Sequence, residues 1–338
     1  MGTITIKDVA KLLNISISTV SRAFNNKYDI NPETRKMILE KCRQLGYSPN
    51  PIAKQLSTKK SYMVGIVVPE FINAFFPRVI MGIQRVMNEA GYQVLIMSSD
   101  ESALKEVENL KALQKNNVDG VIVSLSQETR DVSYYQNLLE DKTPIVQINR
   151  VSQKLETPKV VFEDYKWARL ATEHLISMGY KKIYHLAGPV NMIVSHNRAK
   201  GFTDMMKEHE LYLDAKQPVI EAGIFIEDGR KIAEQLIRDK NIPEAFFCFN
   251  DPIAIGAIEV FKEHGYRIPQ DLAFVGFTES RLAAHLDPPL TSVEQPADEM
   301  GSLSAHILLD MINGKKYNSD TIVRLDGKLN IRQSSIRK

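Results

Sequence analysis

The first 25 residues contain two short helical patterns separated by a break. Apolar residues recur at helical spacing in the first pattern, at Ile6, Val9, Ala10 and Leu13. Asn14 follows, and Asn tolerates the left-handed conformation that a tight break requires. Ser16 is a favourable N-cap for a second helix, whose Val20 and Phe24 face the first helix. Two short helices joined by a turn of three or four residues make a helix-turn-helix motif.

The outer face of the second helix carries short polar groups, one arginine and one isoleucine: Ile17, Ser18, Ser21, Arg22 and Asn25. Such groups suit contacts with phosphates and base edges of DNA, although an ordinary helical hairpin with a polar outside has the same pattern. A third helix is expected after Asn31, an N-cap followed by Pro and Glu, and Gly46 ends it. The buried face predicted for this helix comprises Met37, Ile38, Cys42 and Leu45.

From residue 61 onward, short apolar runs alternate with amphipathic segments. The predicted strands are 63–68, 93–98, 118–123, 144–148, 160–162, 182–186, 218–221, 245–248 and 272–275. The helices predicted between the first of these are 75–90, 103–116 and 132–140. Continuous apolar strands alternating with helices indicate parallel sheets covered on both faces. Because about nine strands exceed what one sheet usually holds, we expect an α/β core with two lobes.

Charge separates the N-terminal segment from the rest. Residues 1–60 contain 11 Lys and Arg against four Asp and Glu, a net charge of +7, while the whole chain carries +2. Residues 61–338 therefore carry −5, and a basic head on a mildly acidic body is typical of a protein that binds nucleic acid through one domain. Cys42 and Cys248 lie far apart in apolar runs and are predicted to be buried free thiols in a reducing compartment.

Targeting signals are not evident in the sequence. The N-terminus lacks the apolar segment of a signal peptide, and the longest apolar runs are too short to span a bilayer. We therefore expect a cytoplasmic protein with no membrane partner.

In the order and spacing of these segments, residues 3–56 resemble the LacI/GalR family of transcription regulators. Residues 47–56, YSPNPIAKQL, resemble the family's hinge, which folds into a helix when two subunits occupy the operator. In the family a leucine of this helix wedges into the minor groove and kinks the DNA, and Leu56 matches it, with Ala53 matching the small residue beside it. By itself the run is too short for a stable helix, so a plain linker is the alternative. The DNA-contacting residues expected with this resemblance are Thr5, Ser16, Ile17, Ser18, Thr19, Ser21, Arg22, Asn25, Asn31, Thr34, Tyr47, Asn50, Ala53 and Leu56.

The resemblance covers nearly the full length and implies a core like a periplasmic sugar-binding protein, with two lobes joined by three crossovers. The crossovers are expected near 162–163, 291–294 and 322–324. The expected division is a helix-turn-helix domain at 1–48, a hinge at 49–60, a first lobe from 61–162 and 294–322, and a second lobe from 163–293 and 323–338.

Ligands in open α/β sheets bind at the carboxyl ends of the strands, which face the cleft in a two-lobed protein. The residues expected to bind the effector follow predicted strands and match family motifs: Asn73, Phe75, Phe76, Asn149, Arg150, Arg198, Phe225, Asn250, Asp251 and Thr278. Arg198 is the strongest expectation because its guanidinium can hold two hydroxyls or an anion. The alternatives are that Phe75 and Phe76 form the core side of a helix and that Asp251 is an N-cap.

Two residues depart from the family pattern. Thr278 stands where the family commonly has an Asp that grips sugar hydroxyls, so we expect the ligand to depend more on Arg198 and Arg150 and to be an acidic or phosphorylated sugar. Trp167, the only tryptophan, stands where the family usually has Gly, and it either caps the cleft or packs on the surface.

Two other classes of protein share parts of this pattern. The DNA-binding head and the missing signal peptide argue against a periplasmic binding protein. The sequence has none of the motifs G-x-S-x-G, G-x-G-x-x-G, G-x-x-x-x-G-K-[ST] and H-E-x-x-H, and its seven His show no metal-ligand spacing, which argues against an enzyme, a metal or a cofactor. The sequence therefore predicts a homodimeric transcription regulator, a repressor, that binds a near-palindromic operator and responds to a sugar or sugar derivative.

Overall fold

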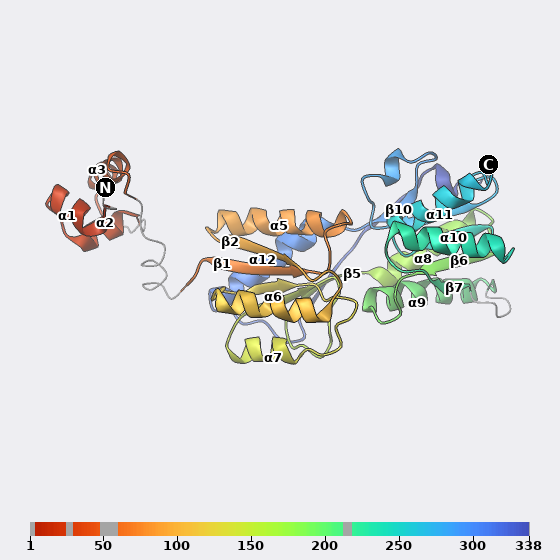
Figure 1. Cartoon of the computed structure of the whole chain (residues 1–338), viewed down its shortest axis with the longest axis horizontal. Helices are drawn as coiled ribbons and strands as arrows, with labels where there is room; N and C mark the ends of the chain where they lie inside the picture. The colour runs from red at the N-terminus through yellow and green to blue at the C-terminus, as the bar shows by residue number, and fades with distance from the viewer. Residues whose placement is uncertain (1–3, 25–29, 48–59, 212–217, 338) are drawn as a thin grey trace. The chain divides into compact units, whose positions relative to one another are not determined.

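The computed structural model describes residues 4–24, 30–47, 60–211 and 218–337 (Figure 1). The chain divides into two compact units, Met1–Ser61 and Tyr62–Lys338.

The first unit contains three helices, α1 (Ile6–Leu13), α2 (Ile17–Phe24) and α3 (Pro32–Gln44). Asn14 between α1 and α2 has φ 53°, the left-handed conformation predicted for the break. The core of this unit consists of Val9, Ala10, Val20, Ala23, Ile38 and Cys42. Met37 was predicted to be buried, and that prediction is wrong, because 47% of it is exposed. The buried face of α3 follows the spacing of Ile38, Cys42 and Leu45, and Met37 lies to one side of it.

The second unit begins with a six-stranded parallel sheet in the order β11-β5-β4-β3-β1-β2. Its strands are β1 (Met63–Val68), β2 (Gln93–Ser98), β3 (Val121–Val123), β4 (Ile145–Ile148), β5 (Lys159–Phe162) and β11 (Ile322–Leu325). Helices cover both faces: α5 (Phe75–Glu89), α6 (Ala103–Lys115), α7 (Ser133–Glu140) and α12 (Ala297–Ile312). Successive residues of β1 point to opposite faces of the sheet and belong to different cores. Ile66 lies in the core with α5 and α12, and Val67 lies in the core with α6 and α7.

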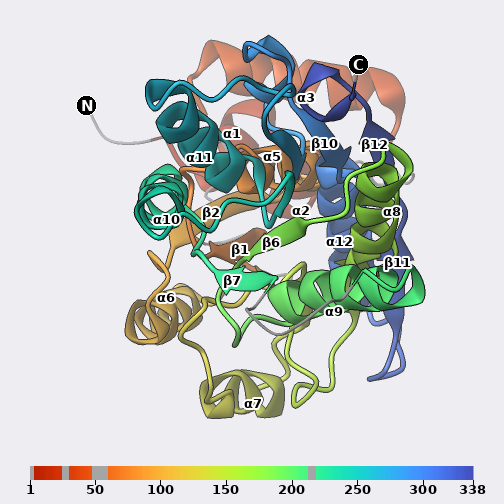
Figure 2. The same ribbon diagram turned by 90° about the vertical axis from the view of Figure 1, so that its right-hand side faces the viewer.

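A second sheet has the order β12-β10-β9-β8-β6-β7 and is parallel except for the pair β10–β12. Its strands are β6 (Ile183–Ala187), β7 (Val219–Glu221), β8 (Ala245–Cys248), β9 (Ala273–Phe277), β10 (Thr291–Glu294) and β12 (Lys328–Asn330). Its helices are α8 (Asp164–Ser177), α9 (Ile193–Glu208), α10 (Ile226–Arg238) and α11 (Asp251–Glu263), with short 3-10 turns at Ala283–His285 and Gln333–Ser335. Figure 2 shows this lobe toward the viewer.

The chain crosses between the two sheets three times, after β5, between β10 and α12, and between β11 and β12. Residues 323–325, assigned from the sequence to the second lobe, lie in β11 of the first sheet and pair in parallel with β5. The third crossover therefore consists of Asp326 and Gly327. The sequence signal is weak here because β11 and β12 are short edge strands with little burial.

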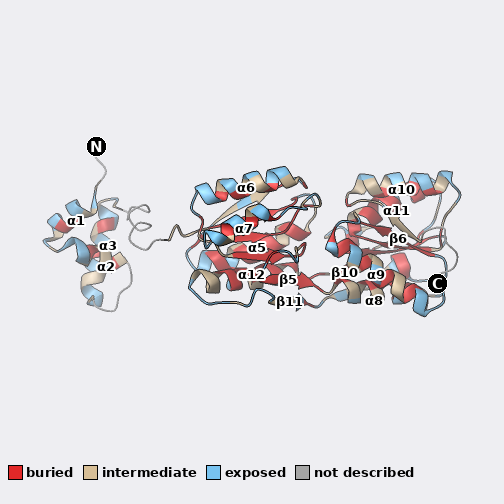
Figure 3. Ribbon diagram, turned by 90° about the horizontal axis from the view of Figure 1, so that it is seen from below, coloured by how far each residue is buried: buried red, intermediate tan, exposed pale blue. Residues whose placement is uncertain are grey.

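Burial follows the layers, with buried residues along the sheets and on the inner faces of the helices (Figure 3). In the first lobe α5 and α12 approach so closely that a Cβ at Gly82 would overlap the Asp298 carbonyl, and one at Gly301 would overlap the Val79 carbonyl. Cys42 and Cys248 are buried free thiols, as predicted. Among the described helices none is long and apolar enough to cross a membrane.

Candidate functional site

The two helices α1 and α2 are fixed by local caps. Thr5 caps α1 reciprocally with Asp8: the Asp8 amide donates to the Thr5 hydroxyl at 3.4 Å, and the Thr5 amide donates to the Asp8 carboxylate at 2.9 Å. Ser16 caps α2, accepting the Thr19 amide at 3.0 Å, and its hydroxyl lies 2.7 Å from those of Ser18 and Thr19. These predicted DNA-contacting residues therefore have a structural role as well.

Helix α2 has the two faces that its spacing predicts. Val20 and Ala23 are buried, whereas Ser18 and Arg22 are exposed and Ile17 is 44% exposed. An exposed apolar side chain between short polar groups suits contact with base edges in a groove.

The remaining predicted contacts of the first unit differ in accessibility. Asn31 is exposed and caps α3 by accepting the Glu33 amide at 2.9 Å, while Thr34 is half-buried. Tyr47 packs edge-on against Phe24 with ring centroids 5.9 Å apart, which ties it to the core of the unit. The predicted contacts that lie outside the described residues are Asn25, Asn50, Ala53 and Leu56.

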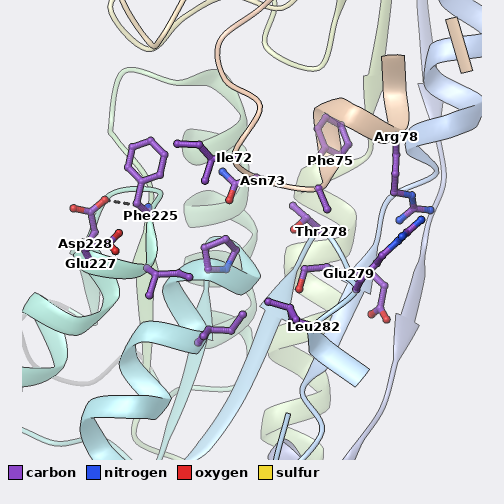
Figure 4. Close-up of a pocket in the computed structure, with 16 residues that line it drawn as sticks. Ile72, Asn73, Phe75, Arg78, Phe225, Glu227, Asp228, Thr278, Glu279 and Leu282 are labelled. Carbon is purple, nitrogen blue, oxygen red and sulfur yellow. Dashed lines mark hydrogen bonds between the residues drawn. The ribbon is translucent and has the colours of Figure 1, made fainter. Parts of the chain in front are cut away.

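A pocket of about 520 Å³ lies between the two lobes of the second unit (Figure 4). Its lining from the first lobe is Ile72, Asn73, Ala74, Phe75 and Arg78. Its lining from the second lobe is Phe225, Ile226, Glu227, Asp228, Pro252, Ile255, Thr278, Glu279, Ser280, Arg281 and Leu282. Four of the ten residues expected to bind the effector, Asn73, Phe75, Phe225 and Thr278, thus share one cavity, and its size suits a small molecule.

On the first-lobe side, Asn73 is held by Glu70. The Asn73 backbone amide and side-chain amide donate to the Glu70 carboxylate at 2.8 and 3.1 Å. Glu70 is buried, and burial raises its pKa. Because Glu70 takes one of the two Nδ2 hydrogens of Asn73, the Oδ1 atom and the second hydrogen are what Asn73 can offer to a ligand hydroxyl.

On the second-lobe side, the segment after β9 has an unusual backbone. Thr278 has φ 92°, which is rare for a β-branched residue, and Glu279 has φ 51°. The Asp251 carboxylate fixes this segment to its own lobe. It accepts hydrogen bonds from the Ser280 amide and, at 2.6 Å, from the Ser292 hydroxyl. Burial raises the pKa of Asp251 to about 7. Asp251 does not line the pocket; it shapes the wall that Thr278 belongs to.

A second, smaller pocket of about 210 Å³ also lies between the lobes. It is lined by Asn149, Val151, Gln153, Lys159, Val161, Phe162, Asp164, Ile193, Val194, Asn197, Ile322 and Arg324. Asn149 has φ 55°, and its buried Oδ1 has no hydrogen-bond partner among the described residues. Within the described residues, Asn149 is the only predicted effector-binding residue that lines the smaller pocket.

Arg198 is bound by its own lobe. It is 2% exposed, its Nε donates to Asp164 Oδ1 at 2.8 Å, and its Nη1 donates to the Phe249 carbonyl at 2.6 Å. Its Cζ lies 3.7 Å from the centre of the Phe277 ring. Burial raises the pKa of Asp164, and the neighbouring Arg198 charge opposes that rise. Arg198 lines neither pocket described above, so the structure gives it a packing role that the sequence did not indicate.

Arg150 is likewise paired within its lobe. Its Nη1 donates to both oxygens of the buried Glu101, at 2.7 and 2.9 Å. Its Cζ lies 5.7 Å from the centre of the Phe76 ring, and Phe76 is 2% exposed. Phe76 therefore belongs to the core side of α5, the alternative that the sequence left open, whereas Phe75 lines the pocket.

Both polar atoms of the Asn250 side chain form hydrogen bonds within the second lobe. Its Oδ1 accepts the Ile253 amide at 3.0 Å as the cap of α11, and its Nδ2 donates to the Ile224 carbonyl at 2.9 Å. It lines neither inter-lobe pocket. The capping role accounts for its position.

Several residues of the site were not predicted: Ile72, Arg78 and Leu282 line the larger pocket, Asp164 lines the smaller one, and Glu101 lines neither but pairs with Arg150. Glu101 follows β2, and Asp164 follows β5. Both carboxylates lie shortly after the carboxyl ends of predicted strands, and this position is the sequence signal for them. Ile72 and Leu282 carry no sequence signal, because an apolar residue in a loop is ordinary. No group of three or more His, Cys, Asp or Glu in the described part of the chain is placed to hold a metal ion.

Each of the two units matches a known protein family. Residues 5–50 match the family model described as bacterial regulatory proteins, lacI family, and residues 172–335 match a periplasmic binding protein-like domain. The HTH-type transcriptional regulator DegA of Bacillus subtilis is 33% identical over 98% of each chain. The ribose operon repressor of Halalkalibacterium halodurans is 33% identical over 93% of this chain and 92% of its own.

Solved structures agree on the fold. The crystal structure of the Lac repressor dimer bound to operator and the anti-inducer ONPF has a TM-score of 0.86, covering 99% of this chain and 100% of its own at 22% identity. The similarity in fold therefore covers both units of this chain.

Proposed function

Because the chain belongs to the lacI family of bacterial regulatory proteins and is a DNA-binding transcriptional regulator, we propose that it is a cytoplasmic, homodimeric repressor controlled by a sugar or sugar derivative. We assign it no enzymatic activity, since its relatives are regulators. DNA binding is assigned to the first unit and effector binding to the pocket between the lobes of the second.

The observation that carries the proposal is the pocket lined by residues of both lobes, Asn73 and Phe75 on one side and Phe225 and Thr278 on the other. A ligand that contacts both lobes binds one lobe arrangement more tightly than another and shifts the population toward it. If the lobe arrangement affects DNA affinity, linkage requires the ligand to change that affinity, typically by ~1–3 kcal/mol.

The charged residues that line the pocket are two arginines, Arg78 and Arg281, and three acids, Glu227, Asp228 and Glu279. They give no net positive charge, which favours a neutral effector over the acidic or phosphorylated sugar expected from the sequence. Arg150 is neutralised by Glu101, and Arg198 by Asp164. Neither guanidinium therefore supplies an uncompensated charge for an anion. The Oδ1 of Asn73 beside Phe75 suits a ring with hydroxyl groups on its edge and an apolar face, and a relative named as a ribose operon repressor is consistent with this class.

Dimerisation and a near-palindromic operator follow as further parts of the proposal. A protein with two-fold symmetry reads a site with the same symmetry, with one half-site per helix-turn-helix. The Lac repressor, whose fold this chain shares, is a dimer bound to its operator. Asn50, Ala53 and Leu56, which are outside the described residues, are proposed to join the DNA contacts.

Selection and binding experiments test the proposal directly. Selection of duplexes from a random double-stranded library with the full chain should return a near-palindrome, and thermal unfolding with a panel of neutral sugars, nucleosides and sugar phosphates should identify a stabilising ligand. Titration of the selected duplex should then show that this ligand changes its Kd by at least fivefold. A ligand that stabilises the protein but leaves the duplex Kd unchanged would refute effector control, and selection of sequences without symmetry would refute the dimeric operator.

A further inference from the structure

The three crossovers between the lobes are packed against one another at Gly327. A Cβ added there would lie 2.6 Å from the ring of Phe162, the last residue of β5 before the first crossover. It would lie 2.7 Å from the carbonyl of Glu294, the last residue of β10 before the second crossover. No side chain fits in that space without a shift. Any change in lobe arrangement must therefore alter the backbone torsions in this packed group of segments.

One side chain in this group, Asp326, fastens the third crossover to α8. Its carboxylate accepts the Trp167 indole N–H at 2.7 Å and the Lys166 ammonium at 2.7 and 2.9 Å, and it also accepts the Gly327 amide at 3.0 Å. Helix α8 belongs to the second lobe, whereas β11, which ends one residue before Asp326, belongs to the first sheet. The carboxylate is thus bound to one lobe and carried by the chain from the other.

The two donors to Asp326 differ in how firmly they can hold it. Lys166 and Asp326 have 49% and 64% of their side chains exposed, and an exposed ion pair of this kind contributes little. Trp167 is partly buried against the main core of the second unit, so its indole is fixed by packing and its N–H has a set direction. The indole bond, rather than the ion pair, therefore determines where Asp326 lies.

We propose that Trp167 and Asp326 form a clasp that sets the equilibrium between lobe arrangements, with Trp167 as the positioning residue. The clasp holds the third crossover in the geometry of this structure, and loss of the indole bond releases that restraint while the sheets and helices stay intact. The consequence for DNA rests on the proposed function, in which the lobe arrangement controls operator affinity. Trp167 lines neither inter-lobe pocket, and its packing against the core directs its indole N–H at Asp326.

The test uses the full chain without any ligand, carrying one spin label in each lobe at Lys115→Cys and Lys231→Cys, two exposed positions. Both native cysteines are buried, so the introduced thiols are the accessible ones. Trp167→Phe keeps a ring and removes the donor, and Asp326→Ala removes the acceptor. Both should change the ratio of the populations in the inter-lobe distance distribution by about fivefold, the ratio that about 1 kcal/mol represents.

Two matched variants separate the clasp from a general loss of contacts. Asp326→Asn keeps an oxygen that accepts the indole N–H. Lys166→Ala removes the exposed ammonium, which pairs with Asp326 and lies 5.5 Å from the centre of the Trp167 ring, but it leaves the indole bond in place. Both variants should therefore retain the wild-type distribution. Identical distributions in wild type, Trp167→Phe and Asp326→Ala would overturn the proposal, as would Lys166→Ala shifting the distribution as far as Trp167→Phe does. The melting temperature of each variant shows that the fold is retained.

The same variants separate failure of the clasp from failure of the proposed function. If the distance distribution shifts and the Kd of the selected duplex shifts with it, the clasp acts on DNA binding. If the distribution shifts while that Kd is unchanged, the clasp stands and the coupling between lobe arrangement and DNA is refuted.

Discussion

The helix caps of the first unit and the two buried arginines of the second unit are held in place by different kinds of contact. In the first unit, the hydrogen bonds of Thr5, Ser16 and Asn31 reach partners two or three positions away. In the second unit, Arg150 is bonded to a residue 49 positions away, and Arg198 to residues 34 and 51 positions away. The residues of the first unit are therefore positioned by one helix and its cap. The two arginines of the second unit are positioned by segments that are far apart in the sequence.

Two arginines make the same contrast. Arg22 is exposed on α2, while Arg198 is 2% exposed between Asp164, Phe249 and Phe277. Substitution of Arg22 should therefore change DNA binding with little effect on the stability of the fold. Substitution of Arg198 should mainly lower the stability of the fold.

The largest effect is expected for Arg198→Ala. Removing the guanidinium leaves the Asp164 carboxylate buried without its partner, which should lower the free energy of unfolding by about 3–5 kcal/mol. Arg169→Ala is the matched control: it breaks a 2.6 Å pair with Glu208 that is 25% and 55% exposed, and it should cost less than about 1 kcal/mol. Urea unfolding at equal protein concentration measures both, and equal losses would remove the contrast between buried and exposed sites.

Arg22→Ala should lower the preference for the selected duplex over a scrambled one by about 1–3 kcal/mol, as loss of a base-edge contact does. Its melting temperature should match wild type, because the side chain is exposed. Lys7→Ala, assigned to a phosphate contact, should weaken both duplexes about equally. If Arg22→Ala weakened both duplexes equally as well, Arg22 would be a phosphate contact and not a reader of sequence.

Asp251→Asn should change how stability depends on pH. Burial raises the folded-state pKa of Asp251 from 3.8 to about 7, so between these values the folded chain keeps a proton that the unfolded chain has lost. The stability that this proton contributes is lost as the pH rises through about 7, with a slope of up to about 1.4 kcal/mol per pH unit.

Asn cannot ionise, so the stability of Asp251→Asn relative to wild type should rise from pH 4.5 to 7 and then level off. Thermal unfolding across pH 4.5–8.5 measures the difference. His185, whose pKa burial lowers to about 4, is present in both proteins and cancels. A difference that does not vary with pH would mean that Asp251 is ionised throughout.

The smallest effect is expected for Thr5→Ala, which removes the cap of α1 and should destabilise the first unit by about 1 kcal/mol. Thr5→Ser restores the hydroxyl and should recover that stability. Hydrogen exchange of the α1 amides reports the change. If Thr5→Ala weakened duplex binding without any faster exchange, Thr5 would act mainly as a DNA contact.

The sequence by itself determined the elements and the surface of the first unit. Helical and strand periodicity placed α1, α2, β1 and β2 at or near their observed bounds, and the spacing of Val20 and Phe24 decided which residues of α2 face outward. These features depend on residues a few positions apart, and such residues lie on one face of one element whatever the rest of the chain does.

Only the tertiary structure decided which predicted ligand residues reach a cavity. The rule that ligands bind at strand ends correctly brought Asn73, Phe75, Phe225 and Thr278 to one pocket, yet it cannot say which side chain at a strand end is already bonded to a neighbour. Arg198 is bonded to Asp164 only because α8 and α9 pack together in the fold. Buried polar groups must find partners, and long-range packing decides whether that partner is the protein or a ligand.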